Sequence, residues 1–69
     1  MNIKNEILKL KHGEKFIEPE SDYGRAEIWC INDVYVVFEI PYLGGEPHYR
    51  DVYHKKNIDS LIHNISTWD

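Results

Sequence analysis

The chain has 69 residues, of which 42% are hydrophobic and 29% are charged, and its formal net charge is −4. This composition is typical of a single small globular domain over residues 1–69 and not of a disordered segment. The acidic balance argues against nucleic-acid binding, which depends on lysine and arginine contacts with phosphate groups.

Cysteine content and apolar runs indicate the environment of the protein. Cys30 is the single cysteine, so the chain cannot form an intramolecular disulfide, and we expect a reducing compartment, a cytoplasm. The N-terminal segment mixes lysine and glutamate with its apolar residues and lacks the uninterrupted apolar region of a secretory signal. No apolar run approaches the length that spans a membrane. We therefore expect neither secretion nor membrane insertion.

The first third of the chain predicts a helix and a short extended segment. Apolar residues at positions 3, 7 and 10 share one helical face, which predicts a helix over 2–11. Asn2 is its candidate N-cap, and Gly13 is its candidate left-handed stop. A short extended piece is expected over 15–17, and a turn over 21–24.

The remainder predicts three strands and a second helix. The strands are expected over 25–31, 34–40 and 48–54. A helix is predicted over 58–66, where apolar residues recur at helical spacing, with Asn57 as a candidate cap. The predicted fold class is therefore α+β with the order α-β-β-β-α, a three-stranded antiparallel meander packed against two helices.

Two tight turns define the predicted strand register. Asn32-Asp33 closes the first hairpin as a two-residue turn, and Gly44-Gly45 closes the second in the same way. This register sets Glu39 opposite Arg50, an opposite-charge match that a shift by one residue would remove.

The predicted sheet has two apolar faces, and the smaller one is the candidate binding surface. We expect the larger set to form the core beneath the helices: Trp29, Ile31, Val34, Val36, Phe38, Ile40, Tyr49 and Tyr53. The smaller face combines an apolar centre with a charged rim, which is the anatomy of an interface. Its candidate partner-binding residues are Ile28, Tyr35, Val37 and Val52 at the centre and Glu39, Arg50 and His54 at the rim.

Other arrangements of the two faces remain open in the sequence. One helix could lie on each face, which would leave no free apolar surface. The smaller face could also be an ordinary half-apolar sheet surface, because exposed valines are common. If it is an interface, it could join two copies of the chain, so a homodimeric accessory protein is the alternative function.

Acidic residues gather ahead of the first long strand. Glu18, Glu20 and Asp22 form either a solvated loop or a patch that steers a basic partner.

No spacing of reactive residues indicates catalysis or metal binding. His48 and His54 lie about 20 Å apart on one strand, too far to share an ion. Cys30 and His54 are two strand spacings apart, about 10 Å, too far for a thiolate–imidazolium pair. We therefore predict no enzyme activity, no cofactor and no metal. A small enzyme or metal protein is the third hypothesis, after a protein-binding module and a homodimer.

A small acidic α-β-β-β-α chain rich in asparagine, isoleucine and lysine resembles the accessory proteins of phages and mobile elements of low-GC bacteria. These include anti-CRISPR proteins and other inhibitors of host defence enzymes. The resemblance covers the whole chain and rests on size, charge and element order. It implies a non-enzymatic inhibitor that blocks a basic nucleic-acid-handling enzyme through a sheet face or a loop, and it assigns no residue a role.

Overall fold

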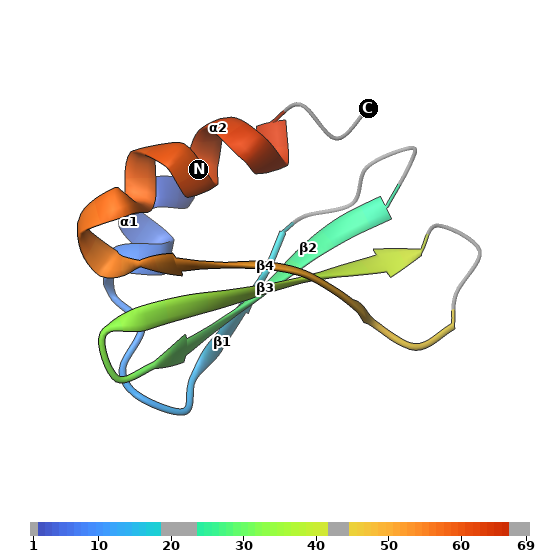
Figure 1. Ribbon diagram of the computed structural model, residues 1–69, viewed down its shortest axis with the longest axis horizontal. Helices are drawn as coiled ribbons and strands as arrows, with labels where there is room; N and C mark the ends of the chain where they lie inside the picture. Colours follow the sequence, from blue (N-terminus) through green and yellow to red (C-terminus); the bar gives the residue numbers. More distant parts are fainter. Residues whose placement is uncertain (1, 19–23, 42–44, 67–69) are drawn as a thin grey trace.

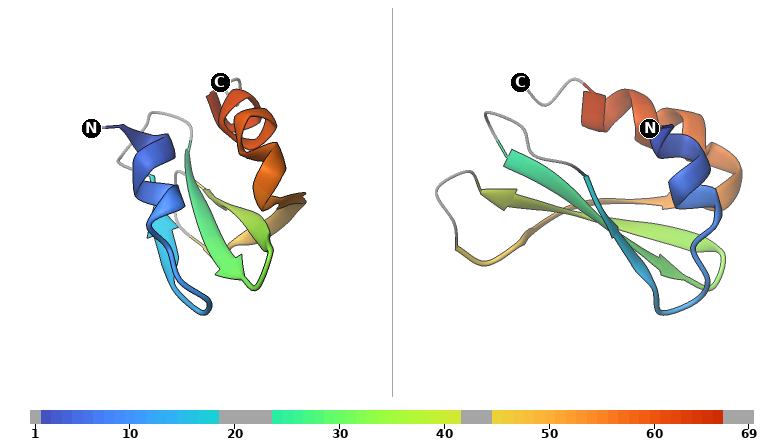
Figure 2. Two further views of the ribbon diagram at one scale, coloured as in Figure 1. Left: turned by 90° about the vertical axis from the view of Figure 1, so that its left-hand side faces the viewer. Right: turned by 180° about the vertical axis from the view of Figure 1, so that it is seen from behind.

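A computed structural model describes residues 2–18, 24–41 and 45–66 of the chain. Its elements are, in order, α1 (Ile3–Leu8), β1 (Lys15–Ile17), β2 (Gly24–Ile31), β3 (Val34–Pro41), β4 (His48–His54), the 3-10 turn η1 (Lys55–Asn57) and α2 (Ile58–Ser66). The four strands form one antiparallel sheet in the order β1-β2-β3-β4. Both helices lie on one face of this sheet (Figures 1 and 2). The predicted α+β class is confirmed, but the sheet has four strands and not three.

The additional strand is β1, at the edge of the sheet. Its residues coincide with the predicted extended piece, and it pairs antiparallel with β2, so that Phe16 lies opposite Ile28. Gly13 has a φ of +87°, and its amide donates a hydrogen bond to the Cys30 carbonyl at 2.8 Å. The left-handed glycine therefore leads the chain into β1 and does not end α1. Three residues carry too little periodicity to predict pairing from sequence.

Helix α1 begins as predicted and ends earlier. Asn2 is its N-cap, because the Asn2 Oδ1 accepts a hydrogen bond from the Asn5 amide at 3.2 Å. The helix ends at Leu8, three residues before the predicted end at Lys11. Ile7 is fully buried, and Leu8 lies off the apolar stripe with 51% of its surface exposed.

Helix α2 spans the predicted residues 58–66, and its Ile58, Leu61 and Ile65 are buried. The predicted cap is wrong, because Asn57 belongs to η1. The residue that caps η1 is His54, whose Nδ1 accepts a hydrogen bond from the Lys56 amide at 3.2 Å.

The first hairpin has the predicted register. Ile31 pairs with Val34 across a two-residue turn, and the remaining pairs of β2 and β3 follow without interruption. Asn32 has a φ of +52°, a left-handed conformation that asparagine adopts more readily than most residues. The turn is therefore local in origin, which is why the sequence predicts it.

The second hairpin differs from the predicted register. The last pair between β3 and β4 is Glu39 with His48, so the connection is longer than a two-residue turn at Gly44-Gly45 allows, and residues 42–44 lie outside the described ranges. Arg50 is the residue that the register between β3 and β4 skips, because a β-bulge separates two registers of pairing. The result is a shift of one residue that turns Val52 toward the other face of the sheet.

The core lies beneath the two helices, on the sheet face that was predicted to be the binding surface. Its buried residues are Ile7, Ala26, Ile28, Cys30, Tyr35, Val37, Ile58, Leu61 and Ile65. The prediction of which face is covered is therefore wrong. The covered face carries the small Ala26 and Cys30 beside the large Tyr35, whereas Trp29 and Phe38 lie on the opposite face.

A candidate protein-binding face

The face of the sheet opposite the helices, here called the outer face, carries neither helix (Figure 2). Strand alternation and pairing place on it Ile17, Trp29, Ile31, Val34, Val36, Phe38, Ile40, Tyr49 and Val52. The most exposed of these are Tyr49 at 60%, Val52 at 45% and Ile17 at 40%. Most of this set was predicted to be the core.

The predicted partner-binding residues are divided between the two faces. Ile28, Tyr35 and Val37 are at most 1% exposed, so they cannot contact a partner of the folded chain. Burial raises the pKa of the Tyr35 hydroxyl above its usual 10.0. Val52 is exposed, but it lies opposite Val36 on the outer face and not beside Val37.

The predicted rim residues form local contacts. Glu39 and Arg50 make the expected ion pair at 2.9 Å between Oε1 and the guanidinium, although the bulge removes their direct strand pairing. His54 is exposed and caps η1. Among the predicted steering residues, Glu18 is half-buried, whereas Glu20 and Asp22 lie outside the described ranges.

A buried carboxylate lies on the outer face. Glu27 is only 6% exposed, and its Oε1 accepts a hydrogen bond from the Trp29 indole nitrogen at 2.7 Å. The Lys15 ammonium lies 3.6 Å from the same oxygen. These contacts follow from the fold, because residues two apart on a strand share a face and Lys15 pairs directly opposite Trp29. Paired in this way, a buried charge is tolerated.

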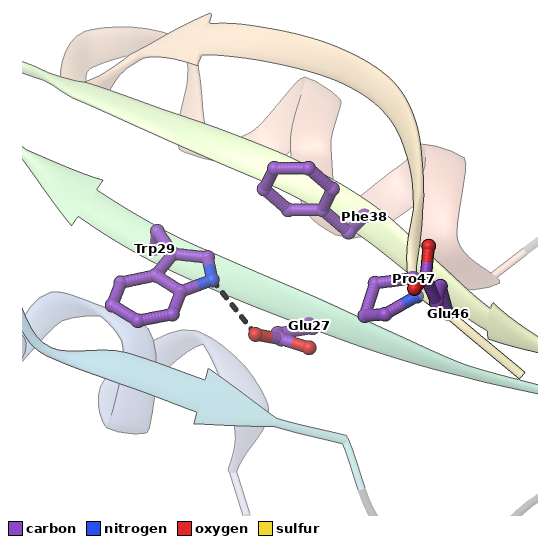
Figure 3. Close-up of a pocket in the computed structure, with 5 residues that line it drawn as sticks. All are labelled: Glu27, Trp29, Phe38, Glu46 and Pro47. Carbon is purple, nitrogen blue, oxygen red and sulfur yellow. Dashed lines mark hydrogen bonds between the residues drawn. The ribbon is translucent and has the colours of Figure 1, made fainter.

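Beside Glu27 the outer face is hollowed (Figure 3). The hollow has a volume of about 430 Å³ and is lined by Glu27, Trp29, Phe38, Glu46 and Pro47. The ring of Tyr49 packs edge-on against Phe38, with ring centres 6.2 Å apart. The lining is thus aromatic on two sides and carries two carboxylates.

Trp29 and Phe38 were predicted to lie in the core, and neither Glu27 nor Glu46 was selected as a site residue. A signal was present: the spacing Glu27-x-Trp29 on a strand places a carboxylate and an indole side by side on one face.

No three histidine, cysteine, aspartate or glutamate residues of the described ranges are grouped to hold a metal ion. Cys30 is a buried free thiol. The imidazole Nδ1 of His12 accepts a hydrogen bond from the Asn32 amide at 3.0 Å, a role in fixing the turn.

The chain matches no protein-family model, no curated protein and no solved structure. Neither helix has the length and the apolar composition needed to cross a membrane.

Proposed function

We propose that this chain is a non-enzymatic protein-binding module whose contact surface is the outer face. The observation that supports the proposal is the exposure of large apolar side chains on a sheet face without helices, led by Tyr49, Val52 and Ile17. Contiguous apolar patches of this kind are uncommon on soluble monomers unless they bind something. Tryptophan and tyrosine are also the residues that most often dominate interface energetics.

A basic protein is the partner that fits this surface best. The chain has a net charge of −4, and the hollow in the outer face is lined by Glu27 and Glu46. A positively charged partner would be attracted over several ångströms before contact, and this attraction weakens as salt is added. The competing occupant of the face is a second copy of the chain, which would bury the same apolar residues in a homodimer. Such a dimer would bring like-charged carboxylates together, which disfavours it.

The resemblance to phage-encoded inhibitors narrows the proposal to one partner class, a basic nucleic-acid-handling defence enzyme. Inhibition would then consist of occupying a surface that the enzyme needs for its substrate. Its direct test is the nuclease or nucleotide-dependent activity of a captured partner, measured with and without the chain.

Affinity capture with matched variants tests the outer face. The immobilised wild-type chain and its Val52→Lys and Leu8→Lys variants are exposed to an extract of the native host. Both substitutions place a lysine at an exposed apolar position, one on the outer face and one on α1. We expect a partner that the wild type and Leu8→Lys retain and that Val52→Lys loses. A partner retained equally by all three would contradict the proposal.

Light scattering at several protein concentrations tests the competing occupant. We expect the mass of a monomer throughout. A stable dimer that Val52→Lys dissociates and Leu8→Lys does not would assign the outer face to a second copy.

A further inference from the structure

The geometry points to a specific ligand for the hollow: we propose that it receives an arginine side chain of the partner protein. This inference rests on the proposed function for the existence of that partner. The chemistry of the hollow can nevertheless be tested on the chain alone.

The charge of the lining favours a cation. Glu27 and Glu46 carry the only charges among the five lining residues. Glu46 forms no ion pair within the described ranges, so its charge is not balanced by the chain there. A cation that enters the hollow therefore meets two carboxylates, the buried one of Glu27 and the exposed one of Glu46.

One carboxylate oxygen of Glu27 is left for a ligand. Both of its contacts, with the Trp29 indole and the Lys15 ammonium, involve Oε1. Oε2 accepts no hydrogen bond within the described part of the chain. Figure 3 shows the carboxylate between the indole and Pro47, with its second oxygen turned away from the indole nitrogen.

The chain already holds one cation on this pair of residues. The Lys15 ammonium lies 5.2 Å from the centre of the Trp29 ring, within the range of a cation–π contact, and at 3.6 Å from Glu27 Oε1. The Trp29–Glu27 pair is thus an aromatic wall and an anion in the arrangement that a positive group requires. Both residues also line the hollow, and Lys15 is not among its lining residues.

Arginine matches the hollow better than lysine does. A guanidinium is planar, so it can stack against the ring of Trp29 or Phe38 while its N–H groups donate to carboxylates in its plane. It is also less strongly hydrated than an ammonium, which reduces the free energy of moving it from water onto a surface hollow lined by aromatic rings. Two carboxylates suit a donor group with several N–H bonds.

Nuclear magnetic resonance of the Trp29 indole N–H tests the inference directly. The full chain, labelled with ¹⁵N, is titrated with Nα-acetyl-arginine amide and separately with the citrulline analogue, which has nearly the same shape and no charge. A Trp68→Phe variant distinguishes the two indole signals of the chain. We expect arginine to shift the Trp29 signal saturably at millimolar concentrations, and citrulline to bind about tenfold more weakly or not at all.

Two outcomes of this titration would overturn the inference: the absence of a saturable shift with arginine, and equal affinity for citrulline. A third titration, with Nα-acetyl-lysine amide, tests the choice of arginine over lysine. If this compound binds as tightly as the arginine compound, the hollow selects positive charge and not the guanidinium, and the assignment to arginine is wrong.

Removal of single charges locates the site. Glu27→Gln keeps an oxygen that can accept the indole hydrogen bond, so we expect the fold to persist and the arginine affinity to fall about tenfold. Glu46→Gln, at an exposed position, should weaken binding by about threefold and guards against a folding defect in the first variant. The matched control is Glu6→Gln on α1, which removes the same charge far from the outer face and should leave the affinity unchanged. Equal weakening by all three variants would reduce the effect to net charge and overturn the inference.

The two proposals fail separately. If arginine does not bind but Val52→Lys still loses the captured partner, the outer face is correctly assigned and the cation chemistry is wrong. If arginine binds and Val52→Lys retains the partner, the hollow is a cation site and the proposed function is wrong.

Discussion

Val36 and Val37 are adjacent in β3 and point to opposite faces of the sheet, so the same substitution at each tests which face is the core. Val37 is 1% exposed beneath the helices, whereas Val36 is half-buried on the outer face. Replacing Val37 by alanine removes two buried methyl groups, worth about 0.8 kcal/mol each, and leaves a cavity, so we expect a loss of about 2–3 kcal/mol. Val36→Ala should lower stability by about 0.5–1 kcal/mol, because part of its side chain already contacts water.

Both variants lose the same strand preference, so their difference isolates burial. A domain of 69 residues is expected to have a free energy of unfolding of about 3–10 kcal/mol, which makes the larger loss a sizeable fraction of the whole. The assay is urea denaturation followed by circular dichroism, with the slope compared between variants. Equal losses, or a larger loss for Val36→Ala, would refute the assignment of the faces.

Three further predictions address the core, the first helix and the behaviour at high pH. The Cys30 thiol is buried, so it should react with a thiol reagent only when the chain unfolds. In the control, a Val52→Cys substitution in a Cys30→Ala background, the thiol should react at once. Rapid labelling of Cys30 in the folded chain would contradict its burial. Asn2→Ala should lower the free energy of unfolding by about 1 kcal/mol and Asn2→Ser by much less, as thermal denaturation can measure; equal losses would exclude a capping role. Burial raises the pKa of Tyr35 in the folded chain above 10.0, so its contribution to stability is complete below pH 10.0 and is lost as the pH rises through the folded value. Urea denaturation across that range should therefore show a steeper loss for the wild type than for Tyr35→Phe, with Tyr49→Phe as an exposed control that behaves like the wild type; identical curves for all three would contradict the assignment.

Local signals predicted the elements of this fold well. The first hairpin is set by Asn32 and its neighbours, and the buried stripe of α2 is set by periodicity, so neither depends on distant contacts. The register between β3 and β4 depends on a bulge at Arg50 and on a connection longer than a two-residue turn. The charge match of Glu39 with Arg50 does not reveal the bulge, because the ion pair forms across it. Register beyond a tight turn is therefore where sequence reasoning failed.

The choice of the covered face failed for a different reason. Both faces of β2 and β3 carry apolar residues, Ile28 and Val37 on one and Trp29 and Phe38 on the other. Alternation alone therefore does not decide which face the helices cover. The covered face holds the large Tyr35 as well as the small Ala26 and Cys30, so the choice depends on how the helices pack over the whole face, which alternation does not report. One uncovered sheet face with apolar side chains was expected and is observed, but it is the opposite face of the sheet. The burial of Glu27 on that face could not be recognised before the faces were assigned.

Solvent accessibility of individual methyl groups tests the central claim most directly. A soluble paramagnetic compound broadens the methyl signals that it can approach, and the sheet offers pairs of identical residues on its two faces: Ile31 and Val52 are 36% and 45% exposed, and Ile28 and Val37 are 0% and 1% exposed. In the monomeric chain we expect strong broadening for Ile31 and Val52 and almost none for Ile28 and Val37. The reverse pattern would show that the helices cover the other face.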